Sequence, residues 1–310
     1  MKILFIGLGS IGTRHLRNMA TILQERREPL EVHALRGTTH LLSTDISSLV
    51  QKQISRYEDL DAAYDAIFIT NPTVLHYETL KKILSKAKKI FIEKPVFSSV
   101  NIDFAALNIP QDTICYVAAP LRYTKVFEHL KRIAGEKRIY SVRAICSSYL
   151  PDWRPMTNYR ECYSASKKNG GDVGLELIHE WDYLVELFGF PQRMRMLSGK
   201  YSDLEISSDD IAIYIAEYKT MLVSLSLDYF GRSRKREIEL YCDDDVIVGD
   251  FVKSEIHFLK SDKAIRLPEE RDSYQIRELE YFLSLSNEEC NQNSISHAFD
   301  VLKIAKGIIG

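Results

Sequence analysis

A lysine stands where an apolar run of the sequence ends. Lys94 lies in the tripeptide Glu93-Lys94-Pro95, directly after Lys89-Ile90-Phe91-Ile92, a run that is typical of a buried strand. Open parallel sheets bind their ligands beyond the carboxyl ends of their strands, and a proline there restricts the backbone. A cation held at this place can polarise a bound hydroxyl or carbonyl group, so Lys94 is the first candidate for chemistry.

A glycine loop follows the first strand-like run and opens a helical pattern. It reads Gly7-Leu8-Gly9-Ser10-Ile11-Gly12. In a dinucleotide-binding motif the first glycine permits a tight turn, the second lets the pyrophosphate approach, and the third lets helix and strand touch. Free N–H groups at the helix start would face the phosphates. The sequence therefore predicts a dinucleotide site formed by Gly7, Gly9, Ser10, Ile11 and Gly12.

The end of the second strand-like run bears on the choice of cofactor. An acidic residue usually closes this strand and binds the ribose hydroxyls, but here residues 30–35 are followed by Arg36, Gly37 and Thr38. An arginine can bind a 2′-phosphate with two hydrogen bonds. We therefore expect NAD(P) with a preference for NADP, contacted by Arg36 and Thr38. The alternative is a solvated Arg36, which would leave both cofactors usable.

Two patterns of elements must position these residues. Strand-like and helical runs alternate up to Pro120, which indicates a doubly wound parallel sheet, because parallel neighbours need helical crossovers. Beyond it come a helix, a strand, a Tyr- and Arg-rich loop, a helix from about Gly171 to Phe188, and strand-like runs joined by tight polar turns. These runs predict a largely antiparallel sheet, and two helical stretches close the chain. We expect an α/β protein with a Rossmann domain over 1–119 and an α+β domain over 120–310.

The predicted strands and helices have the following bounds. The strands are 2–6, 30–35, 66–70, 90–92, 113–118, 139–148, 193–198, 211–218, 221–227, 236–242 and 246–251. The helices are 11–24, 74–85, 125–134, 171–188, 274–284 and 295–309.

Composition restricts the class of protein. A chain of 310 residues that is 45% hydrophobic and 27% charged is ordinary for a soluble globular protein, and a net charge of -2 gives no reason to expect nucleic acid or a membrane surface as partner. Five scattered cysteines without C-x-x-C spacing argue against a disulfide framework or a zinc site. No apolar run is long enough for a signal peptide or a membrane span. We expect a cytoplasmic protein without a metal.

Three segments together resemble the Gfo/Idh/MocA oxidoreductase family. They are the glycine loop, Thr70-Asn71-Pro72-Thr73 with His76 ahead of Glu93-Lys94-Pro95, and Gly170-Gly171 with His179-Glu180-Trp181-Asp182. The resemblance implies a Rossmann domain and a C-terminal α/β domain whose open sheet mediates oligomerisation, here as a homodimer or homotetramer. It also implies NAD(P)-dependent oxidation or reduction of a sugar, cyclitol or sugar-nucleotide hydroxyl.

The resemblance assigns residues around the nicotinamide. Thr70, Asn71, Pro72 and His76 would line its side of the cofactor site. Glu93 and Lys94 would lie beside nicotinamide and substrate, and the family pattern allows a cis Lys94–Pro95 bond.

His179 is the expected partner of Lys94. On one helix, Asp172, Glu176, His179 and Tyr183 would form a single polar stripe. His179 would move the hydroxyl proton as general acid–base, because imidazole titrates near neutral pH. Lys94 would bind the same oxygen and stabilise alkoxide character during hydride transfer.

The surroundings of His179 depart from the family pattern at one position. The family has an aspartate four residues before the histidine, where this chain has Leu175; Glu176 lies on nearly the same helix face and could orient the imidazole. Asp182 is expected to be structural. Glu180 is expected to be solvated or to lie at a domain contact, and the basic cluster 232–236 to be a solvated turn or a subunit contact.

Aromatic and arginine residues in the second half suggest the substrate class. Aromatic rings can stack on sugar faces, and arginines bind carboxylate or phosphate with two hydrogen bonds. We therefore expect an anionic sugar-type substrate contacted by Arg122, Trp153, Arg154, Tyr159, Arg160, Tyr163 and Asp172. Ion pairing between the domains is an equal alternative for the arginines.

Two other functions stay open. One is a non-catalytic dinucleotide-binding regulator, because a fold does not fix a function. The other is reduction of an imine or tetrapyrrole-like substrate. The presence of both Lys94 and His179 favours an enzyme acting on alcohols, whereas Leu175 in place of aspartate favours the regulator.

Overall fold

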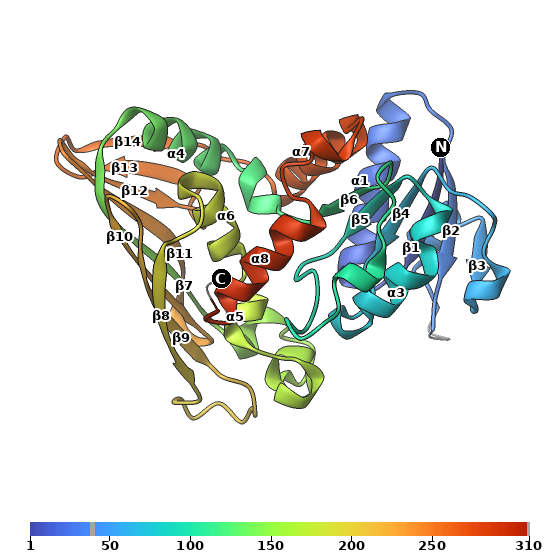
Figure 1. The fold of residues 1–310 in the computed structure, drawn as a ribbon, viewed down its shortest axis with the longest axis horizontal. Coiled ribbons are helices and arrows are strands. Elements are labelled where there is room, and N and C mark those ends of the chain that lie inside the picture. The colour runs from blue at the N-terminus through green and yellow to red at the C-terminus, as the bar shows by residue number, and fades with distance from the viewer. Residues whose placement is uncertain (38–40, 309–310) are drawn as a thin grey trace. The chain divides into compact units, whose positions relative to one another are not determined.

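The chain folds into two units in the computed structural model, which describes residues 1–37 and 41–308 (Figure 1). Unit 1 comprises Met1–Pro120 and Arg271–Phe299, and unit 2 comprises Leu121–Glu270 and Asp300–Gly310. The expected second domain, 120–310, therefore differs from unit 2, because Arg271–Phe299 returns to unit 1. The returning segment contains α7 (Arg271–Ser284), which packs on α1 (Ser10–Glu25), with Arg14 Nη1 donating to Asp272 Oδ1 at 2.7 Å.

Unit 1 is built on a six-stranded sheet with the order β3-β2-β1-β4-β5-β6, in which every pairing is parallel. Continuous Ile-rich runs form its central strands because both of their faces are buried. Helices cross over between strands, as α1 does between β1 and β2, and this confirms the predicted Rossmann fold. The strands are β1 (Lys2–Ile6), β2 (Glu31–Leu35), β3 (Lys52–Ile54), β4 (Ala66–Ile69), β5 (Lys89–Ile92) and β6 (Ile114–Val117), and the further helices of unit 1 include α2 (Thr44–Leu49) and α3 (His76–Ile83).

An aromatic cluster fills one side of this sheet. Phe5, Phe68 and Phe91 lie on the neighbouring strands β1, β4 and β5 and stack in sequence, with ring centroids 4.7 and 5.1 Å apart. Phe282 of α7 meets Phe68 and Phe91 edge-on at 5.7 and 5.4 Å. All four rings are fully buried. The cluster therefore fixes α7 against the strands whose carboxyl ends carry the candidate site.

Unit 2 is built on an eight-stranded sheet with the order β14-β13-β12-β11-β7-β10-β9-β8. Its pairings are antiparallel except that of β10 with β7, so the prediction of a largely antiparallel sheet is confirmed. The strands are β7 (Ile139–Tyr149), β8 (Arg193–Gly199), β9 (Ile211–Glu217), β10 (Leu222–Asp228), β11 (Phe230–Cys242), β12 (Val246–Asp250), β13 (Glu255–Phe258) and β14 (Lys263–Arg266).

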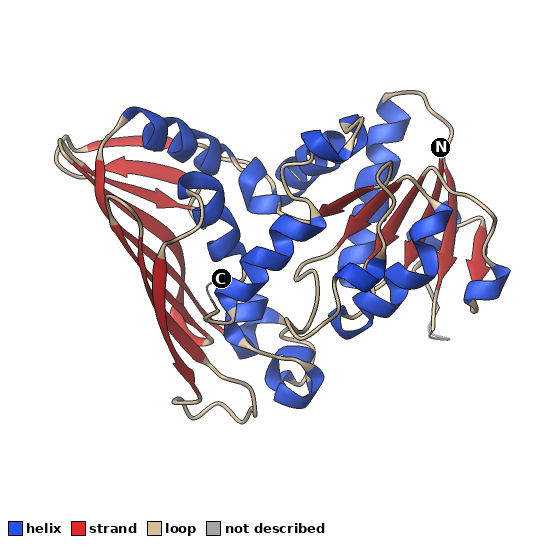
Figure 2. Cartoon of the chain, in the orientation of Figure 1, coloured by secondary structure: helices blue, strands red, loops and turns tan. Residues whose placement is uncertain are grey.

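Helices cover one face of the unit 2 sheet (Figure 2). The helix α4 (Lys125–Glu136) lies against β12, α5 (Val173–Glu176) against β9 and β10, and α6 (His179–Phe188) against β7. Side chains of β9 alternate accordingly: Tyr214 is fully buried, whereas Ile213 and Ile215 are 44% and 58% exposed. The other face of the sheet thus presents apolar side chains to solvent.

The predicted continuous helix over 171–188 is wrong. The chain forms α5 and α6 instead, separated by Leu177 and Ile178, and the φ of −100° and ψ of 29° at Leu177 interrupt the helix. Asp172 is the N-cap of α5, since its Oδ1 accepts from the Gly174 N–H at 2.8 Å. Tyr183 is fully buried and stacks on Phe251. The expected polar stripe on one helix therefore does not form.

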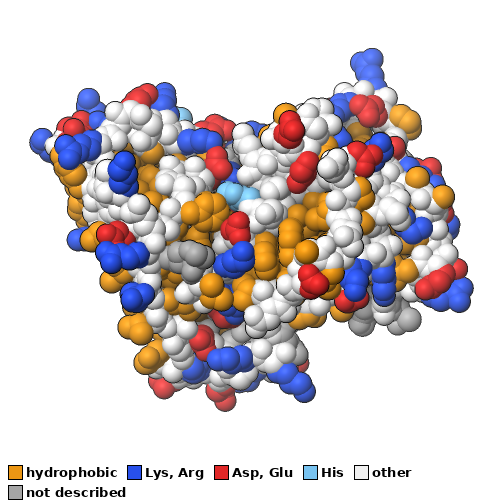
Figure 3. Space-filling model, in the orientation of Figure 1, with side chains coloured by type: hydrophobic (Ala, Val, Ile, Leu, Met, Phe, Trp, Pro, Cys, Tyr) orange, Lys and Arg blue, Asp and Glu red, His pale blue; other side chains and the backbone are white. Residues whose placement is uncertain are grey.

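Positive and negative side chains are interspersed on the face of the molecule shown in Figure 3. Within the described ranges, the helices are too short or too polar to cross a membrane.

Candidate active site

Two of the loop glycines are required by the packing of unit 1 itself. Gly7 follows β1 with a φ of +91°, and a Cβ there would lie 2.8 Å from the Asn71 backbone. A Cβ on Gly12 would lie 2.4 Å from the Gly7 carbonyl oxygen and 2.7 Å from Thr70 Oγ1. The first and third glycines thus let α1 start close to the ends of β1 and β4, as the sequence predicts.

Gly9 differs because the described part of the chain does not fill the space beside it. It is the N-cap of α1, and a Cβ there would meet none of the described residues within 4 Å. The first turn of this helix carries no acidic side chain, so its N–H groups and dipole face open space with positive potential. The residues present therefore fit a pyrophosphate group: Gly9, Ser10 and Ile11 would hold it at the start of α1.

The turn after β4 closes against the glycine loop. Thr70 Oγ1 donates to the Gly7 carbonyl oxygen, and Asn71 Nδ2 donates to Thr79 Oγ1 at 2.9 Å. Pro72 precedes the short 3₁₀ helix Thr73–Leu75. This turn holds the ends of β1 and β4 together.

His76 does not line the site through its side chain, because its ring is fully buried. Its nitrogens lie 3.0 Å from the Asn71 carbonyl oxygen and 3.1 Å from that of Val96. Burial lowers the pKa of His76, although both carbonyl contacts oppose this. His76 therefore bridges the turn after β4 and the segment after Lys94, instead of contacting nicotinamide as the resemblance implies.

Glu93 points into unit 1 rather than toward a ligand. Its Oε1 lies 2.6 Å from Nε2 of His15, which is 1% exposed, and its Oε2 accepts the Lys94 backbone N–H at 3.1 Å. Burial opposes ionisation of Glu93, but the hydrogen bond and charge of His15, with the charge of Lys94, outweigh burial and lower its pKa. Sequence reasoning missed His15, although its place one helical turn after Gly12 was a usable signal.

Lys94 is half-buried and follows the carboxyl end of β5. The Lys94–Pro95 peptide bond is cis, as the family pattern allows. Since β1, β4 and β5 are adjacent and parallel, Lys94 and the glycine loop lie at the same edge of one sheet.

Arg36 leaves β2 at the same edge. Its backbone N–H donates to Ile54 O and its Nη1 to Gln53 Oε1, both at 2.9 Å. Thr38, the other predicted contact for the ribose, lies outside the described residues.

In unit 2, His179 is the first residue of α6 and is half-buried, and Glu176 is the last residue of α5. Glu176 Oε2 accepts from Ser164 Oγ at 3.0 Å. The prediction that Glu180 is solvated or at a domain contact is wrong: it is fully buried, and its Oε1 lies 2.7 Å from Arg236 Nε of β11. Burial raises the pKa of Glu180, and the charge of Arg236 opposes this.

Arg122 is held by carboxylates of α6. It is 8% exposed, binds Asp182 with two hydrogen bonds of 2.9 and 2.7 Å, and donates to Glu186 at 2.7 Å. Arg122 therefore binds two carboxylates of unit 2 instead of making the expected substrate contact. Asp182 has a structural role, as expected, because it binds this buried arginine.

The other expected substrate residues all lie in the segment 149–172. Trp153 is 36% exposed, donates from Nε1 to Ser148 Oγ at 2.9 Å and meets Tyr229 edge-on. Arg160 pairs with Glu205 and lies over the Tyr159 ring at 4.7 Å.

Arg154 is exposed, and the Tyr163 hydroxyl donates to the Gly170 carbonyl oxygen at 3.0 Å. Asp172 pairs with Lys306 at 2.8 Å, in addition to capping α5. The aromatic rings of this segment stay partly accessible, while Arg160 and Asp172 have partners of opposite charge.

Comparison with known proteins identifies the family that the N-terminal third of the chain matches. Residues 1–109 match the Gfo/Idh/MocA oxidoreductase family, which is described by its NAD-binding Rossmann fold. Residues 1–109 therefore carry the NAD-binding Rossmann domain of the Gfo/Idh/MocA oxidoreductase family. Unit 1, which contains these residues, accordingly has an NAD(P)-binding Rossmann fold.

A stretch of 142 residues of this chain is 30% identical to scyllo-inositol 2-dehydrogenase (NAD(+)) of Bacillus subtilis (strain 168). It covers 44% of this chain and 41% of that relative, so the match spans less than half of the relative's length.

Two solved structures share the fold over nearly the whole chain. Levoglucosan dehydrogenase in complex with NADH and levoglucosan has a TM-score of 0.81 at 15% identity, with 99% of this chain and 96% of that chain covered. UDP-N-acetylglucosamine 3-dehydrogenase GnnA from Acidithiobacillus ferrooxidans has a TM-score of 0.76 at 18% identity, with the same coverage. At these identities the likeness concerns the fold alone.

Proposed function

We propose that this chain is an NAD(P)-dependent oxidoreductase that transfers a hydride between nicotinamide and a hydroxyl-bearing carbon of a sugar, cyclitol or sugar nucleotide. The observation that carries the proposal is the shared sheet edge in unit 1, where the open space beside Gly9 and the half-buried Lys94 lie at the ends of adjacent parallel strands. A phosphate cradle and a cation at one edge suit an enzyme that binds a dinucleotide and an alcohol oxygen together. The relatives support the substrate class, because their names specify scyllo-inositol, levoglucosan and UDP-N-acetylglucosamine.

The chain's own residues then have distinct roles. The loop from Gly7 to Gly12 binds the pyrophosphate, and the bound cofactor supplies or accepts the hydride. Lys94 Nζ donates a hydrogen bond to the reacting oxygen and stabilises negative charge on it. His179 accepts the hydroxyl proton on a ring nitrogen during oxidation and returns it during reduction. Glu176, three residues before His179, is the carboxylate that we propose to orient the imidazole.

We infer a preference for NADP from Arg36. Arg36 follows the carboxyl end of β2, where an acidic residue usually binds the ribose hydroxyls. Its guanidinium donates a hydrogen bond to Gln53 Oε1. A 2′-phosphate would form a charge-assisted pair with it. Titration with NADH and NADPH tests this preference, and equal dissociation constants would remove it.

We also propose self-association through the exposed face of the unit 2 sheet. Leu197 of β8 is directly opposite Ile213 of β9, and these side chains are 80% and 44% exposed, beside Ile215 at 58%. Adjacent apolar side chains on an uncovered sheet face are typical of a protein–protein interface. A second copy of this chain is the proposed partner.

The experiment that tests the function is a screen of NAD⁺ and NADP⁺ reduction with cyclitols, neutral sugars, uronic acids and nucleotide sugars. Turnover with one class supports the proposal. If the cofactor binds and every class stays silent, the regulator becomes the better account, and the buried Leu175, which replaces the family's aspartate, favours that outcome.

A further inference from the structure

We propose that His15 is a positioning residue for Lys94. This inference rests on the function proposed above, because it concerns the lysine that we assign to the reacting oxygen. His15 acts through Glu93, which lies between the two.

A single carboxylate joins helix α1 to the backbone of Lys94. Glu93 Oε1 lies 2.6 Å from His15 Nε2, and Glu93 Oε2 accepts the Lys94 N–H at 3.1 Å. The two oxygens thus bind two partners that are 79 positions apart in the sequence, 15 and 94. Losing the first contact would free the carboxylate to rotate away from the second.

The imidazole is itself held rigidly. His15 is 1% exposed, and its ring meets Phe91 edge-on with a centroid distance of 4.9 Å. Phe91 belongs to β5 and stacks on Phe68 within the aromatic cluster. Since Gly12 lies one turn before His15 and packs against the Gly7 carbonyl, the phosphate loop and Lys94 are joined through one set of close contacts.

The chemistry of the His15–Glu93 hydrogen bond determines which substitutions of His15 remove it. His15 Nε2 must carry a proton to donate to a carboxylate, whereas His15 Nδ1 has no hydrogen-bond partner among the described residues. Glutamine can supply the same N–H to Glu93, and leucine of similar size cannot.

The first test needs no cofactor. The backbone amide of Lys94 is followed by hydrogen exchange in the full-length protein and in its His15→Gln and His15→Leu variants. We expect exchange at least about tenfold faster in His15→Leu and close to wild type in His15→Gln, because the amide loses or keeps its acceptor. The matched control is His33→Leu, which removes another buried unit 1 histidine paired with a glutamate, Glu31.

The second test compares turnover with cofactor binding, using the best substrate of the screen. We expect His15→Leu to lower kcat by roughly 10–100-fold, because small misplacements of a catalytic group have effects of this size. The NADH dissociation constant should change little, and His15→Gln should restore most of the kcat. A folded His15→Leu variant with wild-type amide exchange and wild-type kcat would overturn the proposal.

Two further variants allow the proposal to be tested even if His15→Leu does not fold or Lys94 is not catalytic. If His15→Leu does not fold, His15→Asn replaces it, because asparagine keeps a polar group but is too short to reach Glu93; the same losses are expected. Lys94→Met separates the two proposals. Wild-type turnover in Lys94→Met would contradict the assigned function, while Lys94 amide exchange in the His15 variants would still decide whether His15 positions this segment.

Discussion

The carboxylate of Glu180 lies 2.7 Å from the guanidinium of Arg236, and the Glu180 side chain has no exposed surface. This pair fastens the first turn of α6, which begins at His179, to β11 of the underlying sheet. The position of the proposed acid–base residue therefore depends on a buried ion pair made by its neighbour in sequence.

Substitution of one partner of this pair should be strongly destabilising. Glu180→Gln leaves the charge of Arg236 uncompensated, and we expect a loss of about 3–5 kcal/mol in the free energy of unfolding measured in urea. The double variant Glu180→Leu/Arg236→Met should recover most of that loss, because an apolar pair needs no charge compensation. A change below about 0.5 kcal/mol in Glu180→Gln, the range of an ordinary surface substitution, would mean that the pair does not anchor α6.

Arg122→Ala should lower stability rather than weaken substrate binding. The change leaves Asp182 and Glu186 without the buried cation that binds both, and about 3–5 kcal/mol is the expected loss. Thermal and urea unfolding measure it. If stability is unchanged while KM rises, Arg122 contacts the substrate after all, as the sequence pattern had indicated.

Alanine at two of the loop glycines should separate folding from cofactor binding. Gly12→Ala places a Cβ against the Gly7 carbonyl and Thr70 Oγ1, so we expect about 1–3 kcal/mol of destabilisation. Gly9→Ala meets open space and should alter stability by less than about 1 kcal/mol, the scale of an N-cap change. NADH binding should nevertheless fall sharply in Gly9→Ala, because the methyl group stands where the pyrophosphate approaches. Unchanged NADH affinity in this variant would contradict the proposed cradle.

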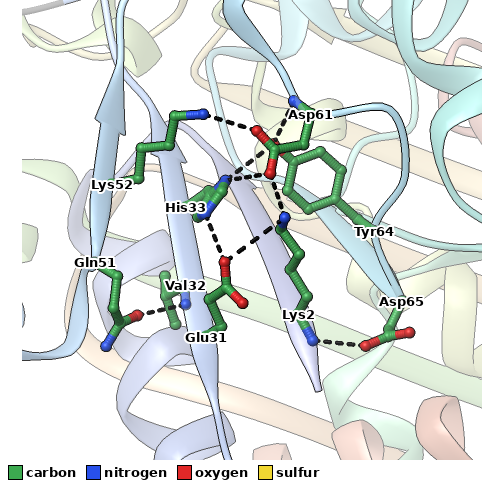
Figure 4. A network of polar contacts seen from close by, with 9 residues as sticks. All are labelled: Lys2, Glu31, Val32, His33, Gln51, Lys52, Asp61, Tyr64 and Asp65. Carbon is green, nitrogen blue, oxygen red and sulfur yellow. Dashed lines mark hydrogen bonds and ion pairs between the residues drawn. The ribbon is translucent and has the colours of Figure 1, made fainter.

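A network of ion pairs at the amino ends of β1 and β2 should make the stability of the fold depend on pH in the acid range (Figure 4). Asp61 binds Lys2 and, at 2.7 Å, Lys52. Hydrogen bonds from both lysines hold the pKa of Asp61 well below its ordinary value. A carboxyl with a depressed folded-state pKa stabilises the fold above its unfolded pKa of about 4, and this contribution is lost as the pH falls further. Wild type should therefore be more stable than Asp61→Asn near neutral pH, and the difference should shrink below about pH 4. Parallel stability curves at all pH values would contradict this.

Charge on the open sheet face should dissociate the proposed oligomer. Ile213→Glu places a carboxylate beside Leu197 and Ile215, and burying it in an interface is unfavourable. We expect a lower mass by sedimentation than for wild type. Leu41→Glu is the control, since Leu41 is 97% exposed in unit 1. If wild type and Ile213→Glu have equal masses, the protein either is a monomer or associates through another surface, and the proposed interface is contradicted.

Local patterns predicted most of the fold. The strand over 2–6 is found at its expected ends, and most other boundaries lie within a few residues, because apolar runs between turn signals report burial directly. The strands β3, β13 and β14 were missed because each has only three or four residues, which is too short for a periodic apolar pattern to stand out. The break at Leu177 also left no signal in the sequence.

The candidate site was predictable where its parts are contiguous in sequence. The glycine loop and Glu93-Lys94-Pro95 each carry their own signal. The environments of Arg122, Glu180 and His15 depend on partners at least 56 positions away, Asp182, Arg236 and Glu93. Spacing on one element says nothing about such partners, so the burial of these charged side chains came only from the tertiary structure.

The central claim is that Lys94 and His179 serve hydride transfer on an alcohol oxygen. Formation of reduced nicotinamide by the wild type, Lys94→Met and His179→Asn, with the best substrate of the screen, tests it most directly. We predict that each substitution lowers kcat by about 10²–10⁴-fold while the cofactor still binds, the size expected for general acid–base groups. Wild-type turnover in either variant would contradict the claim.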